Sequence, residues 1–237
     1  MGKMSNKDRK EVLRNTHNIL TWLWILIMVL AAGKAIQNLI YYVDPVTRNE
    51  VLRNWSDFTP QVVVLFLVFL FTMVRFYHGD TRYLDRTYLE AQLAEFDPEV
   101  HSYFDRILDF YILVFHGIIF YAMASFEREF VGFVTVYVIL LYFNVAWLAV
   151  LYYRQRARIR RGALGDDSRQ AAMEVQRAAK WWIVNNMVCA SLLVPLLFTT
   201  DCIKAPYSLT IFGIVAMANT IIDYLGTKYF YFPLARL

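Results

Sequence analysis

Residues 62–85 read VVVLFLVFLFTMVRFYHGDTRYLD, and this stretch decides the fold. Its first half carries no charge, as expected of a helix that crosses a membrane. Its second half brings a cation and a histidine within four residues. On a continuing helix, the polar residues that follow share one face within about 120° of arc: Arg75, His78, Arg82, Asp85 and Arg86. The stretch therefore predicts a transmembrane helix whose charged stripe either marks the membrane exit or lines a site.

The composition extends this prediction to the whole chain. Of 237 residues, 58% are hydrophobic, 17% aromatic and 19% charged. Soluble domains usually carry about 45–50% apolar residues and about 25% charged ones. The charges here are concentrated between long apolar runs, which is typical of a polytopic membrane protein. The net charge of +4 does not indicate nucleic-acid binding, because the basic residues flank the apolar segments.

Several apolar segments are long enough to span a bilayer as helices. We expect one all-α transmembrane domain over residues 1–237, with six spans at about 19–39, 59–78, 107–126, 130–151, 181–200 and 206–226. The second span should start at Thr59-Pro60, since proline suits a first helical turn. Residues 79–106 and 152–180 keep a helical pattern, which predicts two helical hairpins outside the membrane.

The distribution of lysine and arginine predicts the orientation. With both termini in the cytosol, most of the 24 Lys and Arg residues fall on the cytosolic side. The exceptions lie within a span or in the outer loops: Lys34, Arg48, Arg53, Arg128 and Lys204. We therefore expect a multi-pass membrane protein with both termini and both hairpins in the cytosol. In a bacterium this would be the inner (plasma) membrane.

Polar side chains within the spans gather in the cytosolic half of the predicted membrane. They come from spans two to six: Arg75, His78, Asp109, His116, Asn144, Asn185, Asn186, Asn219 and Asp223. Charged groups in spans are costly and normally face the bundle interior, where they pair or contact water. We expect Arg75 to find its partners in Asp109 and Asp223, because an arginine–carboxylate pair neutralises two costly charges.

Two interpretations of this polar cluster stay open. In the first, it is a structural knot that locks spans two, three and six together, with asparagines as interhelical links. In the second, it lines a cavity open to the cytosol, with His116, Asp109 and His78 on its wall. Apolar residues 62–71 and 133–141 would then close the outer half. This second arrangement is typical of a hydrophobically gated channel or an inward-facing transporter.

The main hypothesis is therefore a channel or transporter for a small ion or solute. We expect a homo-oligomer in the lipid bilayer, with a cytosolic ligand or partner acting on the helical extensions. A non-catalytic membrane scaffold or effector subunit is the first alternative, since it needs only the structural knot. An intramembrane enzyme on a lipid-like substrate is the second, with His116 as base and Asp109 as the group that orients it.

The familiar signatures of enzymes and cofactors are missing from the sequence. Its four histidines are widely separated, whereas intramembrane metal enzymes need dense clusters of histidine and carboxylate. Its nine glycines form no phosphate-binding loop, and no serine lies in a nucleophile-elbow pattern. We therefore expect no catalytic residue, no metal and no cofactor.

Overall fold

The computed structural model describes residues 6–43, 50–52, 58–89, 103–126, 129–160, 166–199 and 205–232, and nearly all of them are helical. The all-α prediction is confirmed. The long helices are α1 (Asn6–Ile40), α2 (Pro60–Leu84), α3 (Tyr103–Ser125), α4 (Phe130–Arg160), α5 (Asp166–Thr199) and α6 (Ala205–Gly226). A π-helical turn (Asp85–Leu89) continues α2, and the short α7 (Lys228–Tyr231) follows α6.

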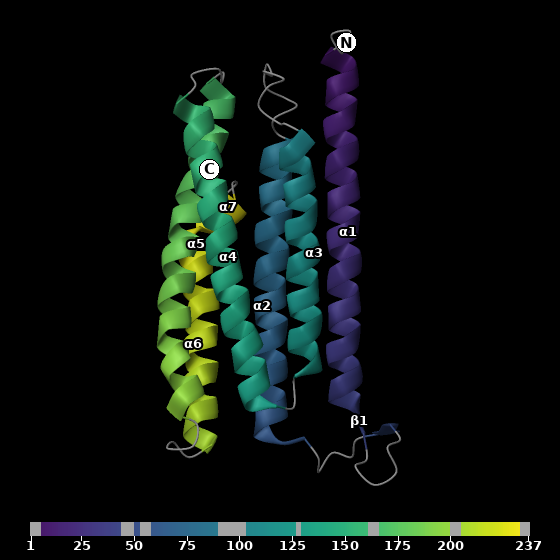
Figure 1. Ribbon diagram of the computed structural model, residues 1–237, viewed down its shortest axis with the longest axis vertical. Helices are drawn as coiled ribbons and strands as arrows, with labels where there is room; N and C mark the ends of the chain where they lie inside the picture. Colours follow the sequence, from purple (N-terminus) through teal and green to yellow (C-terminus); the bar gives the residue numbers. More distant parts are fainter. Residues whose placement is uncertain are drawn as a thin grey trace.

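The long helices lie side by side along one axis (Figure 1). α1 and α3 form one edge of the bundle, α5 and α6 form the other, and α2 and α4 lie between them. α2 contacts α1, α3, α4, α6 and α7, so it is the central helix. The beginning of α1 and the short α7 lie toward the same end of the bundle, which we call the N-terminal end (Figure 1).

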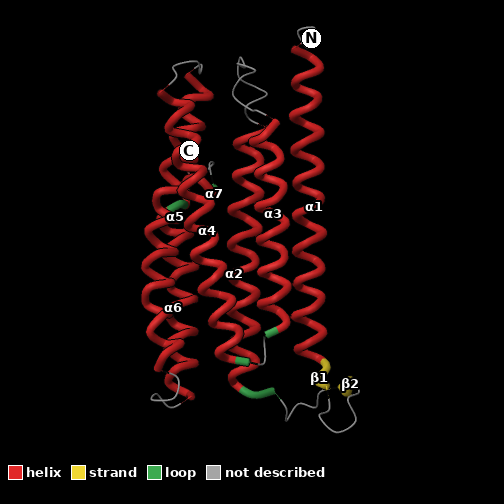
Figure 2. Tube along the Cα trace, in the orientation of Figure 1, coloured by secondary structure: helices red, strands yellow, loops and turns green. Residues whose placement is uncertain are grey.

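A two-stranded hairpin lies at the opposite end of the bundle (Figure 2). Strands β1 (Tyr41–Val43) and β2 (Glu50–Leu52) pair antiparallel, with Tyr41 opposite Leu52. The predicted spans 19–39 and 59–78 leave a loop at this position, and the strands are an addition to it. Three-residue strands are too short to show the alternation of apolar and polar residues by which strands are recognised.

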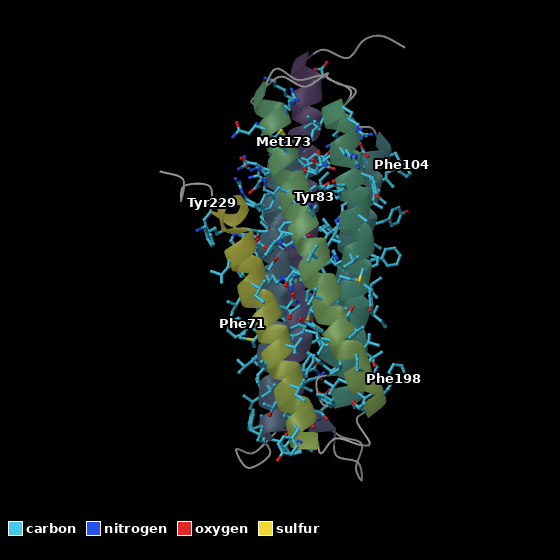
Figure 3. All side chains as sticks on the ribbon, turned by 90° about the vertical axis from the view of Figure 1, so that its left-hand side faces the viewer. Phe71, Tyr83, Phe104, Met173, Phe198 and Tyr229 are labelled. Atoms are coloured by element: carbon cyan, nitrogen blue, oxygen red, sulfur yellow. The ribbon has the colours of Figure 1, made fainter. Side chains whose placement is uncertain are left out.

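All six long helices are long and apolar enough to cross a membrane. Large apolar side chains point away from the bundle, such as Phe104 and Phe198 in Figure 3, of which Phe198 is 81% exposed. A protein in water rarely leaves apolar surface uncovered over such an area. The structure therefore favours a multi-pass membrane protein.

The helices continue beyond the predicted spans at the N-terminal end. α4 extends to Arg160 and α5 begins at Asp166, so most of the predicted hairpin 152–180 is helical, and residues 161–165 lie outside the described part. In the predicted hairpin 79–106, residues 79–89 and 103–106 are helical, and residues 90–102 lie outside the described part.

α2 begins where the sequence predicts, and the local contacts explain why. The Thr59 hydroxyl accepts a hydrogen bond from the Val62 amide at 3.4 Å, and Pro60 occupies the first turn. This cap satisfies one of the amides that a helix start leaves without a partner.

Aromatic rings fill the half of the bundle away from the N-terminal end. Phe69 and Phe120 meet edge to face at 6.2 Å between ring centroids. Phe212 makes the same kind of contact with Phe133 at 5.9 Å and with Tyr137 at 5.5 Å. Such pairs contribute about 0.5–1.5 kcal/mol each beyond the burial of their area. The polar residues described next lie on one side of this aromatic layer.

Candidate functional site

Arg75 of α2 lies at the centre of a buried ion-pair cluster. Its Nε donates to Asp223 Oδ2 of α6 at 2.8 Å, and its Nη2 donates to Asn186 Oδ1 of α5. The Tyr231 hydroxyl of α7 donates to the same Asp223 oxygen at 2.9 Å. Arg75 is 3% exposed and Asp223 is fully buried, so each charge relies on the other for compensation. We call these four residues the Arg75 cluster.

The end of α6 is shaped so that Tyr231 reaches Asp223. The Thr227 hydroxyl donates to the Asp223 backbone carbonyl at 2.6 Å, which closes the last turn of the helix. Gly79 of α2 leaves room for the Tyr231 hydroxyl, because a β-carbon at this position would lie 3.3 Å from it. The close approach of α7 therefore explains why residue 79 is a glycine.

The predicted asparagines of α4, α5 and α6 are buried beside the Arg75 cluster. Asn185 Nδ2 donates to the Asn219 carbonyl at 2.9 Å, and Asn219 Nδ2 donates to the Tyr137 hydroxyl at 3.3 Å. These bonds join α4, α5 and α6 in the way that amide side chains link membrane helices. Asn144 is also buried and lines a small cavity next to Arg75.

Asp109 of α3 lies in a second buried cluster. It accepts hydrogen bonds from the hydroxyls of Tyr83, at 3.1 Å to each carboxylate oxygen, and of Tyr88. Arg154 of α4 donates to it at 3.1 Å and also pairs with Asp105 at 2.9 Å. Arg154, which lies in the predicted hairpin 152–180, thus neutralises a buried acid of α3. We call these five residues the Asp109 cluster.

Buried His116 of α3 and half-buried Asp80 of α2 form a third polar group. His116 Nδ1 lies 3.5 Å from Asp80 Oδ2, and His116 has no exposed surface. Within the described part of the chain, neither His116 nitrogen nor Asp80 Oδ2 makes a hydrogen bond. The rings of Phe76, Phe143 and Trp24 surround the imidazole, with centroids 5.3, 5.2 and 6.1 Å away. We call these two residues the His116–Asp80 pair.

A cavity of about 30 Å³ lies between Asp80 and the Arg75 cluster. Arg75, Asp223 and Tyr231 line it on one side, together with Asn144. This volume holds one or two water molecules. The Arg75 Nη1 atom has no hydrogen-bond partner among the described residues. The cavity therefore gives Asp80 and the Arg75–Asp223 ion pair a common polar space.

The structure pairs Arg75 with one of its two expected partners. Asp223 lies at 2.8 Å, whereas Asp109 pairs with Arg154 instead. The direction of the side chains around α2 explains the difference. Tyr83, which donates to Asp109, points about 80° further around this helix than Arg75 does. Asp109 of α3 therefore contacts the neighbouring side of α2, where Tyr83 lies.

The three residues expected on one cavity wall lie in different surroundings. Asp109 is held by tyrosines and Arg154, and His116 faces Asp80 within aromatic rings. His78 lies partly exposed at the margin of the Arg75 cluster, where its ring packs on Tyr231 at 4.6 Å between centroids. His78 is therefore separated from both Asp109 and His116.

Asp80 is not among the residues that the sequence predicts for the site, although it lies within residues 62–85. Arg75 and Asp80 point about 140° apart around α2, so Asp80 lies outside the charged stripe that begins at Arg75. A central helix buries a wide arc, so it can present charged residues to partners on two sides. Tyr83, Tyr88 and Tyr231 were missed for another reason. Tyrosines near a membrane boundary resemble the ordinary aromatic belt.

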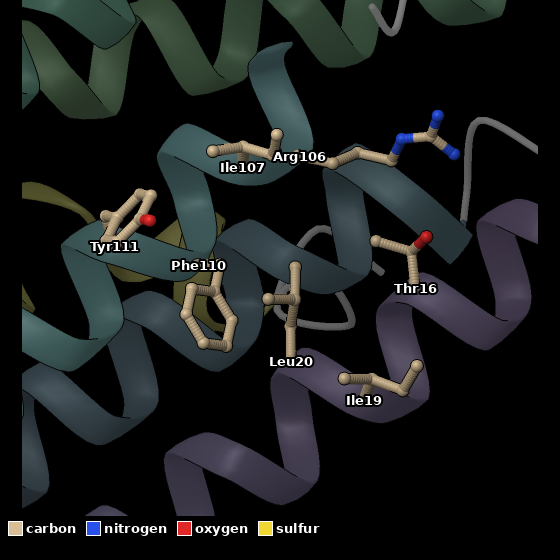
Figure 4. Close-up of a pocket in the computed structure, with 7 residues that line it drawn as sticks. All are labelled: Thr16, Ile19, Leu20, Arg106, Ile107, Phe110 and Tyr111. Carbon is tan, nitrogen blue, oxygen red and sulfur yellow. The ribbon is translucent and has the colours of Figure 1, made fainter. Parts of the chain in front are cut away.

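The larger hollows lie on the surface of the bundle. One of about 490 Å³ lies between α1 and α3, and its lining is mostly apolar (Figure 4): Thr16, Ile19, Leu20, Arg106, Ile107, Phe110 and Tyr111. Another of about 490 Å³ lies between α5 and the segment that joins α6 to α7. Neither is lined by an ionisable residue of the three polar clusters, so the buried site and the surface hollows are separate features.

The described residues contain no group of three or more His, Cys, Asp or Glu side chains placed to hold a metal ion. The His116–Asp80 pair offers two such groups, fewer than a structural or catalytic metal site usually needs. No known protein family matches the sequence, and no curated protein or solved structure is significantly similar to it.

Proposed function

We propose that the protein is an integral membrane channel or transporter for a small ion, and that the conformation described here is closed. The His116–Asp80 pair carries this proposal. His116 lies in the middle of α3, buried among apolar rings, and Asp80 lies half-buried near the end of α2. Much of the hydrogen-bonding capacity of this pair is unused. Ionisable groups in spans are costly, and they commonly mark ion pathways and proton relays.

The position of the polar groups along the bundle supports a one-sided pathway. The Arg75 cluster, the Asp109 cluster and the His116–Asp80 pair all lie on the N-terminal side of the aromatic layer around Phe69, Phe120 and Phe212. We place this side in the cytosol because the Lys and Arg residues concentrate there. Polar groups that lie next to a packed apolar layer match the arrangement of a closed hydrophobic gate.

The size of the internal space favours a very small permeant species. The cavity beside Asp80 measures about 30 Å³ and holds one or two water molecules. Histidine and aspartate both take up and release protons. A proton is therefore the species that this site suits without a large rearrangement, with Asp80 and His116 as its binding groups.

The test is a flux assay on the full chain reconstituted in liposomes that contain a pH-sensitive dye. We expect the wild type to dissipate an imposed pH gradient under a membrane potential, and Asp80→Asn and His116→Phe to lose this activity. His78→Phe is the matched control, since it changes a histidine of α2, the helix of Asp80, that lies outside the pair. A folded wild type that passes no protons, small cations or anions would overturn the proposal.

A membrane scaffold or effector subunit is the second candidate function. The Arg75 cluster favours it, because every residue of that cluster hydrogen-bonds to another member and together they join α2, α5, α6 and α7. In that case His116→Phe would leave function intact, while loss of Arg75 would cause misassembly. Oligomerisation and a cytosolic partner at the helical extensions are compatible with both candidates.

A further inference from the structure

The hollow between α5 and the α6–α7 segment differs from the one in Figure 4 by its charge. It measures about 490 Å³, and its rim carries Arg177, Lys180 and Glu174 of α5. Glu174 is neutralised by Arg86 at 2.9 Å. Within the described part of the chain, Arg177 and Lys180 have no ion-pair or hydrogen-bond partner. The hollow therefore presents two uncompensated positive charges.

Below these cations, α5 exposes a continuous apolar stripe. Trp181, Val184, Val188 and Leu192 follow at spacings of three and four residues, which places them on one face of the helix. Trp181 and Val184 line the hollow, and all four side chains are exposed. The stripe runs from the basic rim toward the other end of the bundle. A cationic rim above an apolar stripe matches a molecule with an anionic head and a hydrocarbon tail.

The wall of the hollow depends on a glycine. A β-carbon at Gly226 would collide with the indole of Trp181, so only glycine lets this ring lie against the end of α6. The next residue, Thr227, also lines the hollow and closes the helix turn at Asp223. The hollow is thus a defined part of the fold, adjacent to the segment that positions Tyr231.

We propose that this hollow is a binding site for an anionic phospholipid. Arg177 and Lys180 would bind the phosphate of the headgroup, and the stripe that begins at Trp181 would take an acyl chain. Basic residues at the ends of membrane helices attract anionic headgroups, whereas a zwitterionic headgroup leaves the two charges largely uncompensated. This inference requires that the bundle lies in a membrane and does not require transport.

The test measures lipid binding on the purified full chain in neutral detergent by native mass spectrometry, with thermal unfolding as a second readout. The probes are phosphatidylglycerol, phosphatidylcholine and inorganic phosphate. We expect phosphatidylglycerol to bind and to raise the unfolding temperature, phosphatidylcholine to bind more weakly, and inorganic phosphate to have no effect. Because lipid binding is read without flux, a failed transport assay would leave this result standing.

Two sets of variants locate the site. Arg177→Gln and Lys180→Gln are each expected to weaken phosphatidylglycerol binding roughly fivefold. Arg169→Gln, an exposed arginine of the same helix outside the hollow, is the matched control. Gly226→Leu should displace Trp181 and lower the binding of every lipid. If this variant fails to fold, the two surface variants decide alone.

Three outcomes would overturn the proposal. The first is equal affinity for phosphatidylglycerol and phosphatidylcholine, and the second is unchanged binding in the Arg177→Gln/Lys180→Gln double variant. The third is full competition by inorganic phosphate, which would assign the cations to a free anion instead of a lipid.

Discussion

The Arg75 cluster and the His116–Asp80 pair lie on two sides of α2, and both bring charged groups into the bundle, yet they are built differently. In the first, a guanidinium meets a carboxylate at 2.8 Å, and Tyr231 adds a further hydrogen bond. In the second, two groups that each gain and lose protons face one another at 3.5 Å, and aromatic rings enclose the histidine.

This difference separates two uses of buried polarity. An arginine stays charged at any accessible pH, so one partner of the Arg75–Asp223 pair keeps its charge throughout. A histidine and an aspartate change their charge while the helices stay in place. We therefore expect the Arg75 cluster to control the stability of the bundle, and the His116–Asp80 pair to contribute little to stability but to be required for transport.

Arg75→Ala should have the largest effect on stability. It leaves the Asp223 carboxylate buried without a cation, and breaking a buried pair typically costs about 3–5 kcal/mol. We expect a low yield of folded protein in detergent and a large fall in unfolding temperature. The double variant Arg75→Met/Asp223→Leu removes both charges and should recover much of the loss. A single variant as stable as the wild type would show that this cluster does not lock the helices.

Asp109→Ala should have the second-largest effect on stability. It removes the acceptor for Tyr83, Tyr88 and Arg154, but Arg154 keeps its ion pair with Asp105. Hydrogen bonds to charged groups are worth about 1.5–3 kcal/mol each, and retention of the second pair limits the total loss. Thermal unfolding of Asp109→Ala and Arg75→Ala, measured under the same conditions, checks that the second variant loses more stability. A greater loss for Asp109→Ala would make the Asp109 cluster the main lock.

Sequence reasoning recovered the helices because they depend on long apolar runs and on local caps. The start of α2 at Thr59-Pro60 is an example, since it needs only residues within one turn. The Arg75–Asp223 pair was also within reach, because both residues lie at similar depth in spans that end at the same side. Counting depth along each span was enough for this part of the site.

The partners of Asp109 and His116 were out of reach for a physical reason. Depth along a span is a local property, whereas the direction in which a helix turns its side chains depends on its neighbours. Only the position of α3 and α4 around α2 decides that Arg154 meets Asp109 and that Asp80 meets His116. A sequence search that considered both faces of the central helix would have included Asp80 among the candidates.

Tyr231→Phe should have the third-largest effect on stability, after Arg75→Ala and Asp109→Ala. It removes the hydroxyl that donates to Asp223 and leaves the Arg75–Asp223 pair in place. We expect a loss of about 1.5 kcal/mol, at the lower end for a hydrogen bond to a charged group. Thermal unfolding at neutral pH measures it. A loss as large as that of Arg75→Ala would mean that α7 contributes as much to the lock as the ion pair itself.

The same variant predicts a difference at alkaline pH. Burial, and then the neighbouring Asp223 carboxylate, raise the pKa of Tyr231 well above its ordinary value of 10.0. The unfolded chain then loses this proton at a lower pH than the folded protein does. The contribution of Tyr231 is therefore complete below pH 10 and is lost as the pH rises further. The wild type should lose stability above pH 10 more steeply than Tyr231→Phe, and parallel curves would contradict this.

His116→Phe should have the smallest effect on stability, and it tests the difference between the two regions most directly. The new ring has a similar shape and enters a space already lined by Phe76, Phe143 and Trp24. Because His116 forms no hydrogen bond among the described residues, the substitution breaks none there. We expect an unfolding free energy within about 1 kcal/mol of the wild type, or a small gain. A loss comparable to that of Arg75→Ala would show that His116 is a structural residue, and the transport proposal would then lose the observation on which it depends.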